Sequence, residues 1–129
     1  MRFVRVAHDA SAAGRAAEEL IYGPDGVTSH AQKDLQRAGE LGRRMVTLLG
    51  FGETLGPVSH SGWSARAVSF EQKLAIDREV ATLLADSYAR VQAKLKNNEP
   101  ALHRVAAALL KYEALDAKQI KAAIEGGEV

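Results

Sequence analysis

The chain has 129 residues, of which 47% are hydrophobic, and its 17 Lys and Arg nearly balance 16 Asp and Glu, for a formal net charge of +1. This composition is typical of one globular domain and excludes wholesale disorder, and the balanced charge gives no basis for binding nucleic acid or an anionic membrane. The sequence contains no cysteine, which excludes a disulfide framework and a thiolate nucleophile and is compatible with a reducing, cytoplasmic location.

The first helix is expected over residues 7–22, where alanines are frequent. The sequence Gly-Pro-Asp-Gly at 23–26 predicts a turn that ends it. Residues 3–6 are compatible with a short strand or with an extension of the helix, and the sequence does not decide between them. No segment predicts membrane contact, because the longest charge-free apolar run, 105–110, is far shorter than the roughly 20 residues that span a bilayer.

A second helix is predicted to begin at Ser29, since Ser29 and Gln32 have the spacing of a capping box. Gly50 is placed to end it in a left-handed conformation. Between these two points apolar residues recur every three or four positions, as expected for a helix with one buried face. These positions are Leu35, Ala38, Leu41, Met45 and Leu48.

Residues 50–68 have no helical period and are rich in Gly and Ser, which predicts an irregular loop. Trp63, the only Trp of the chain, lies in this loop. Such a residue either covers the edge of the core or contacts a binding partner, because Trp is enriched at contact surfaces. Trp63 is therefore a candidate binding residue.

Three further helices are expected from Ser69 to the C-terminus. Ser69 and Gln72 form a second capping box that opens a long helix reaching about Lys96, and Asp116 and Gln119 form a third that opens the last helix, which Gly126 ends. The helix between them accepts a Pro in its first turn. It is expected to bury five apolar residues, namely Leu102, Val105, Ala106, Leu109 and Leu110.

These patterns predict an all-α fold of about five helices in a single domain, 1–129. The domain divides into a helical segment at 7–49, the loop at 50–68 and a three-helix segment at 69–127. The last three helices are expected to form an antiparallel bundle.

Several motifs resemble the later part of the peptidase domain of FtsH-type ATP-dependent zinc metalloproteases. They are Gly-Arg-Ala-Ala-Glu-Glu-Leu at 14–20, Thr-Ser-His-Ala-Gln-Lys-Asp-Leu at 28–35, Arg-Arg-Met-Val at 43–46 and Leu-Gly-Pro-Val-Ser at 55–59. The resemblance covers about 13–124, and segment 7–49 resembles the peptidase core. It implies a helical fold and self-association or association with FtsH-like subunits, since the family assembles into hexameric rings. Arg15, Glu18 and Glu19 are expected to be structural and to form surface ion pairs.

The resemblance implies that Asp34 matches the third zinc ligand of the family. Zinc peptidases of this kind take their other two zinc ligands, both histidines, and their catalytic base from a His-Glu-x-x-His motif. This chain contains no such motif. Asp34 is therefore a vestigial ligand, or a carboxylate favoured by the helix dipole in the first turns. His30 shares its helix face at four-residue spacing and is interpreted as a surface histidine.

The segment that begins with His8 and Asp9 is compatible with a decayed metal motif. We prefer to assign it to the helix that runs into Gly-Arg-Ala-Ala-Glu-Glu-Leu, because that alignment needs no large deletion.

These observations favour a non-catalytic structural or assembly module related to the FtsH peptidase, with no catalytic residue and no cofactor in this chain alone. A first alternative is a fragment or subunit of an ATP-dependent zinc metalloendopeptidase, with zinc bound once a missing segment or another chain supplies the metal-binding helix. A second alternative is a stand-alone helical module that binds a partner through Trp63.

Overall fold

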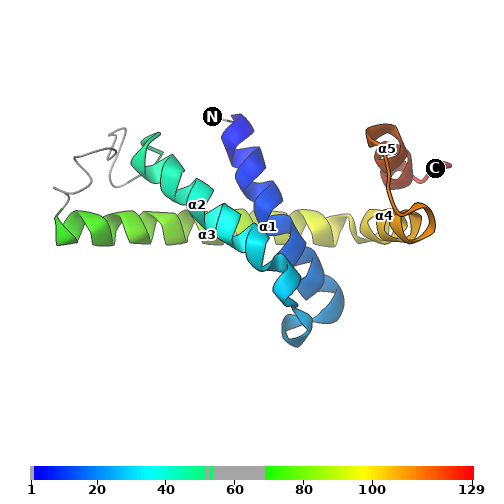
Figure 1. The fold of residues 1–129 in the computed structure, drawn as a ribbon, viewed down its shortest axis with the longest axis horizontal. Helices are drawn as coiled ribbons and strands as arrows, with labels where there is room; N and C mark the ends of the chain where they lie inside the picture. The colour runs from blue at the N-terminus through cyan, green and yellow to red at the C-terminus, as the bar shows by residue number, and fades with distance from the viewer. Residues whose placement is uncertain (1, 52, 54–68) are drawn as a thin grey trace. The chain divides into compact units, whose positions relative to one another are not determined.

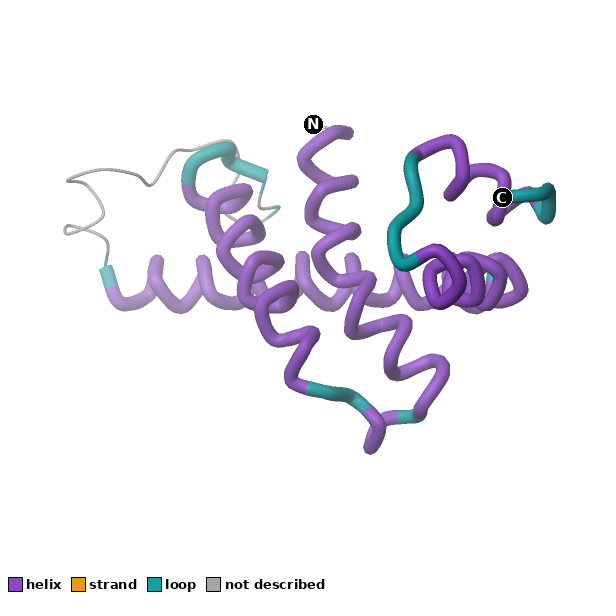
Figure 2. The backbone as a smooth tube through the Cα atoms, turned by 45° about the vertical axis from the view of Figure 1, so that its right-hand side comes forward, coloured by secondary structure: helices purple, strands orange, loops and turns teal. Residues whose placement is uncertain are grey.

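The computed structural model of the chain describes residues 2–51, 53 and 69–129. The described residues are mostly helical and contain no strand, which confirms the all-α prediction (Figures 1 and 2). The structure describes only residues 50, 51 and 53 of the predicted loop at 50–68. The prediction of the loop and the candidate residue Trp63 therefore lie outside the described residues. The five α-helices among them are α1 (Arg2–Tyr22), α2 (Gln32–Thr47), α3 (Phe70–Asn97), α4 (Glu99–Tyr112) and α5 (Ala117–Glu125), with 3₁₀ turns η1 (Pro24–Gly26) and η2 (Ser29–Ala31).

Helix α1 settles the alternative that the sequence left open at its start, because residues 3–6 extend the helix. The helix ends at the predicted turn, where Gly23 has a φ of 78°, a left-handed conformation that glycine adopts without strain. Among residues 4–22 of α1, the buried side chains are His8, Ala12 and Ala16, which follow one another at four-residue steps. Small residues at such spacing let a neighbouring helix approach closely.

The start of α2 differs from the predicted capping box. The Thr28 side chain accepts a hydrogen bond from the His30 backbone N–H, and a 3₁₀ turn at 29–31 precedes the α-helix. The Ser29–Gln32 box was therefore the wrong cap, because Thr28 serves as the cap one residue earlier. Gly50 does adopt a left-handed φ of 64°, as predicted.

Helices α1 and α2 lie side by side in both views of the backbone (Figures 1 and 2). Ala38 and Met45 of α2 are fully buried, as the predicted stripe requires. Leu48 is 42% exposed, so its predicted burial is wrong. Gly42 and Val46 are buried in its place, which rotates the buried face of the helix away from Leu48.

Helix α3 begins with the predicted capping box. The Gln72 N–H donates to Ser69 Oγ at 3.2 Å, and the Ser69 N–H donates to Gln72 Oε1 at 3.1 Å. Further along, Ile76 and Val80 form a core cluster with Val46 of α2, and Leu83 and Leu84 pack against it. This cluster connects α3 to α2.

The chain forms two compact units, residues 1–92 and 93–129, and the boundary falls within α3. The single domain and the antiparallel bundle of the last three helices therefore stay predictions. No helix in the described part of the chain is long and apolar enough to span a membrane.

In the second unit, α4 follows the cap position Asn98 and has Pro100 in its first turn, as predicted. Its predicted buried set is largely wrong, since Leu110 is 88% and Leu109 43% exposed. Ala108 is the buried residue of α4, and at about 100° per residue Leu110 points roughly to the other side of the helix.

Helix α5 is fixed at both ends. Asp116 and Gln119 form the predicted capping box, and Gly126 ends the helix with a φ of 80°. Arg104 of α4 then binds the last turn, since its Nε donates to the Ala123 carbonyl at 2.9 Å and its Nη2 donates to that of Ile124 at 2.6 Å. Such bonds satisfy carbonyls that the end of a helix leaves without intrahelical partners.

Candidate functional site

Asp34 lies in the first turn of α2 and is partly buried. Its carboxylate faces α1 at Gly14, because a Cβ atom placed on Gly14 would lie 2.8 Å from Asp34 Oδ2. A glycine is thus needed in α1 to leave this space. Within the described residues Asp34 makes no hydrogen bond or ion pair. The carboxylate can therefore take a ligand without breaking a contact with these residues.

His30 does not share a helix face with Asp34, and that prediction is wrong. His30 belongs to the 3₁₀ turn that precedes α2, where the residue spacing of an α-helix does not apply. Its Nδ1 lies 3.1 Å from Thr28 Oγ1. Because Thr28 Oγ1 donates its one hydrogen to Glu18, we infer that Nδ1 carries the proton of the neutral ring and donates to Thr28. The His30 side chain thus holds the turn at the start of α2.

Glu18 connects α1 to the same turn. Its carboxylate accepts hydrogen bonds from the Thr28 N–H at 2.9 Å and from the Thr28 hydroxyl at 2.8 Å. These two bonds lower the pKa of Glu18, because they favour its ionised form. Neither bond involves Arg15, so the structure gives Glu18 a different partner from the predicted ion pair.

Glu19 binds the third helix. It accepts a hydrogen bond from the Tyr88 hydroxyl of α3. Burial, and then this bond, raise the pKa of Tyr88. The expectation that the Glu-Glu pair is structural therefore agrees with the contacts, although the partners are Thr28 and Tyr88.

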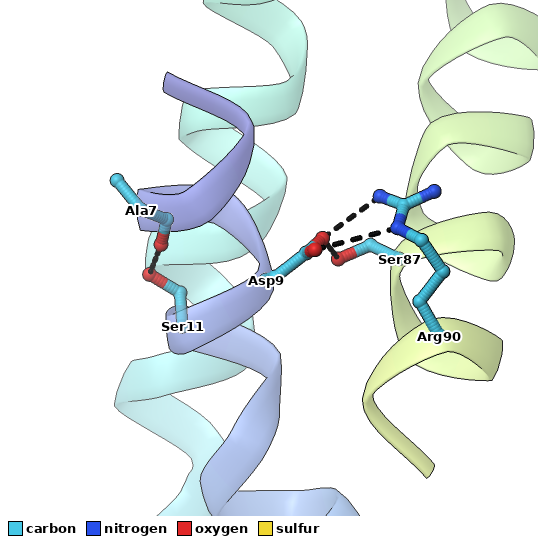
Figure 3. Close-up of polar contacts among 5 residues, drawn as sticks. All are labelled: Ala7, Asp9, Ser11, Ser87 and Arg90. Atoms are coloured by element: carbon cyan, nitrogen blue, oxygen red, sulfur yellow. Dashed lines mark hydrogen bonds and ion pairs between the residues drawn. The ribbon is translucent and has the colours of Figure 1, made fainter. Parts of the chain in front are cut away.

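Asp9 forms a polar clamp between α1 and α3, defined as Asp9 with Ser87 and Arg90. Figure 3 shows the Asp9 carboxylate pointing from α1 to both partners on α3. Ser87 Oγ donates to Asp9 Oδ1 at 2.6 Å, and Arg90 donates from Nη2 to Oδ1 at 2.8 Å and from Nε to Oδ2 at 3.3 Å. Burial alone would raise the pKa of Asp9, but the bonds from Arg90 and Ser87 outweigh it and lower the pKa.

His8 lies beside this clamp and is only 1% exposed. Its ring packs against Gly42 of α2, where an added Cβ would lie 3.3 Å from His8 Nε2. His8 and Asp9 thus hold α1 against two neighbouring helices. Their contacts are those of a folded helix interface, which agrees with assigning them to the helix that runs into Gly14.

Two further pairs of polar side chains lie at the surface. Arg43 of α2 pairs with Asp77 of α3 at 2.7 Å, with more than half of each side chain exposed. His103 of α4 is 60% exposed and its Nε2 lies 3.5 Å from Glu99. Exposed pairs of this kind add little stability.

Neither the clamp nor the burial of His8 was predicted from the sequence. The spacing of His8, Ala12 and Ala16 gave a signal for His8, because these positions recur on one face of a helix. No local signal joins Asp9 to Arg90, which lies 81 residues away along the chain.

Most of the chain matches a known family of peptidases. The model of Peptidase family M41 matches residues 5–123, which is most of the chain. The chain belongs to peptidase family M41. This match confirms the predicted resemblance to FtsH-type metalloproteases.

Several members of the M41 family are similar to the chain. The ATP-dependent zinc metalloprotease YME1L1 of Homo sapiens is 42% identical over 118 residues, which cover 92% of this chain and 15% of that protein. FTSH 11, chloroplastic/mitochondrial, of Arabidopsis thaliana is 43% identical and is covered to 14%, with 88% of this chain aligned. FtsH of Photobacterium profundum is 39% identical and is covered to 17%, with 83% of this chain aligned. The chain thus spans about a sixth of the length of these relatives.

These M41 relatives are named as zinc metalloproteases, and zinc in proteins takes three or four nitrogen, sulfur or oxygen ligands. In residues 2–51, 53 and 69–129 no three His, Asp or Glu side chains come together to hold a metal ion. Asp34 therefore provides a single donor, and these residues do not fit zinc by themselves. No catalytic step through zinc follows from their geometry.

Proposed function

We propose that this chain is a non-catalytic helical module of an M41 peptidase domain, and that it acts as a structural and assembly unit. The observation that carries the proposal is that the polar side chains of α1 bind neighbouring elements of the fold. Glu18 binds the turn before α2, and Asp9 and Glu19 bind α3. The family's expected ligand helix, His-Glu-x-x-His, has no counterpart in the sequence.

Self-association, or association with FtsH-like subunits, belongs to this proposal. Its support is the family membership together with the exposed apolar side chains on both units, such as Val6, Phe70 and Leu110. A location in a reducing, cytoplasmic environment also belongs to it, since the chain has no cysteine.

Two measurements on the purified chain test the module. Light scattering is expected to give a mass above that of one chain, and incubation with casein is expected to leave the casein intact. A compact monomer would contradict the assembly role. Casein cleavage that a chelator stops, and that survives a second purification step, would contradict the non-catalytic assignment.

A second candidate function is supported by Asp34 itself. The chain would then be part of an ATP-dependent zinc metalloendopeptidase, with Asp34 joining a metal-binding helix from another segment or another polypeptide. The support is a partly buried carboxylate that has no partner in the described part of the chain, with Gly14 leaving the space in front of it. Burying a carboxylate without a partner is costly, so a ligand for Asp34 would remove a cost.

A mixing experiment separates the two candidates. The chain is combined with a polypeptide that carries the His-Glu-x-x-His segment of an M41 relative, and the zinc retained after dialysis is measured. If Asp34 completes the site, the mixture retains zinc and Asp34→Ala abolishes the retention, whereas the exposed control Asp77→Ala does not. Equal retention with Asp34→Ala would reject this second function. The stand-alone module that binds through Trp63 stays a prediction.

A further inference from the structure

His8 is a titratable side chain enclosed between helices. It is 1% exposed and shares the inner face of α1 with Ala12 and Ala16. On the α2 side the ring meets Gly42, and a methyl group on that glycine would come within 3.3 Å of Nε2. The ring is therefore closely packed against α2 and almost fully shielded from solvent.

The Nε2 atom of His8 is buried and forms no hydrogen bond of normal geometry with the described residues. In the neutral ring Nε2 can be an acceptor that receives no hydrogen bond, and burying such a neutral acceptor costs only a limited amount of free energy. Protonation turns Nε2 into a charged donor that needs a partner. A buried charge without a hydrogen-bonding partner is far more costly than a buried neutral acceptor.

The charged groups around His8 do not provide that partner. On α1 itself the nearest is Asp9, which is already bound by Arg90 and Ser87 of α3 (Figure 3). From α3, the positive charge of Arg90 opposes a second positive charge at His8. From α2, the facing positions are Ala38 and Gly42, which carry no charge. The Ala38 carbonyl favours the protonated ring, but it gives Nε2 no hydrogen bond of normal geometry.

Together, these surroundings lower the pKa of His8. Burial lowers the pKa of His8 below its ordinary value of 6.5, and this outweighs the opposing influence of Asp9 and of the Ala38 carbonyl. In the unfolded chain the ring is hydrated and binds a proton near its ordinary pKa. Between the two pKa values the unfolded chain holds one proton more than the folded chain. Stability is therefore complete above pH 6.5 and is lost as the pH falls below it.

We propose that His8 is a proton-operated switch that loosens α1 from α2 and α3 when the pH falls. The neutral ring fills the space over Gly42 and keeps the three helices together. The protonated ring has to reach water or break the Asp9 clamp to find a partner, and either movement separates α1 from its neighbours. This property is independent of whether the chain binds zinc.

The test begins with the wild-type chain. Proton NMR titration of its histidine rings between about pH 7.5 and about pH 5 is expected to show that His8 is still neutral below pH 6.5, the ordinary pKa of a histidine ring. Amide hydrogen exchange, corrected for the intrinsic effect of pH on exchange, is expected to lose protection in α1 and α2 on acidification but not in α5. If His8 becomes protonated at or above pH 6.5, or if α1 keeps its protection on acidification, the switch does not exist.

Variants then assign the effect to the ring. Urea unfolding at a series of pH values is measured for the wild type, for His8→Gln, which cannot titrate, and for His103→Gln as the exposed control. For each unit by which the pH falls, the unfolding equilibrium constant of the wild type is expected to rise by a larger factor than that of His8→Gln, and the two factors differ by at most about tenfold. The His103→Gln variant controls for the loss of a histidine outside the contact between α1 and α2. Equal pH dependence of wild type and His8→Gln would overturn the proposal, and if His8→Gln does not fold, the wild-type titration decides.

Discussion

Two glycines of α2 allow a matched test of the packing between α1 and α2. Gly39 and Gly42 lie one turn apart in the same helix, and neither has a positive φ. A Cβ atom added to Gly39 would meet nothing within 4 Å. A Cβ atom added to Gly42 would lie 3.3 Å from His8 Nε2 and 3.7 Å from Val80 Cγ1. The same substitution thus meets open space at one position and a packed interface at the other.

The magnitudes follow from helix propensity and from packing. Alanine is about 0.8–1.0 kcal/mol more favourable than glycine inside a helix, so Gly39→Ala is expected to stabilise the chain by about that amount. At Gly42 the same gain opposes an overpacking cost of about 1–3 kcal/mol, because the neighbouring His8 ring is buried and closely packed. Gly42→Ala is therefore expected to lower the free energy of unfolding by about 0–2 kcal/mol.

The assay is urea unfolding followed by far-UV circular dichroism, with amide exchange of α1 and α2 to locate the effect. A double-mutant cycle with His8→Ala sharpens it, because removing the ring removes the clash. In that background Gly42→Ala is expected to become stabilising by about 1 kcal/mol, like Gly39→Ala. If Gly42→Ala stabilises the chain that still has His8 as much as Gly39→Ala does, the close packing of His8 on α2 is refuted.

Two further variants test contacts elsewhere in the chain. Asp9→Asn is expected to lower the free energy of unfolding in urea by about 1–3 kcal/mol, because it weakens a partly buried, charge-assisted clamp with Arg90. Asp77→Asn, in an exposed pair, is expected to lower it by under about 1 kcal/mol. Equal costs would show that the clamp adds no stability beyond that of an exposed pair. Asp116→Ala is expected to cost about 1 kcal/mol by removing the cap of α5, seen as faster amide exchange confined to that helix, and unchanged exchange would contradict the capping box.

Local signals in the sequence predicted part of the fold. The capping boxes at Ser69 and Asp116 are confirmed, because a cap depends on residues three positions apart. The predicted box at Ser29 is wrong because the neighbouring residue, Thr28, caps the turn instead, and its side chain accepts a hydrogen bond from the His30 N–H. The burial of Leu110 was also wrong, because an apolar run does not tell which of its faces meets a neighbouring helix.

Of the candidate site, only Asp34 could be predicted from the sequence, because it lies within a family motif. The family motif pointed to Asp34, and the structure adds that Gly14 leaves room for its carboxylate. The contact of His8 with Gly42 and the clamp between Asp9 and Arg90 join distant parts of the chain. Contacts of this kind depend on how helices pack, and neither periodicity nor spacing within one helix shows them.

The zinc content of the purified chain tests the central claim most directly. Elemental analysis is made after expression with zinc in the medium and dialysis against metal-free buffer, on the wild type and on Asp34→Ala. The non-catalytic module is expected to hold far less than one zinc per chain, with no difference between the two proteins. Retention of one zinc per wild-type chain, lost in Asp34→Ala, would contradict the claim.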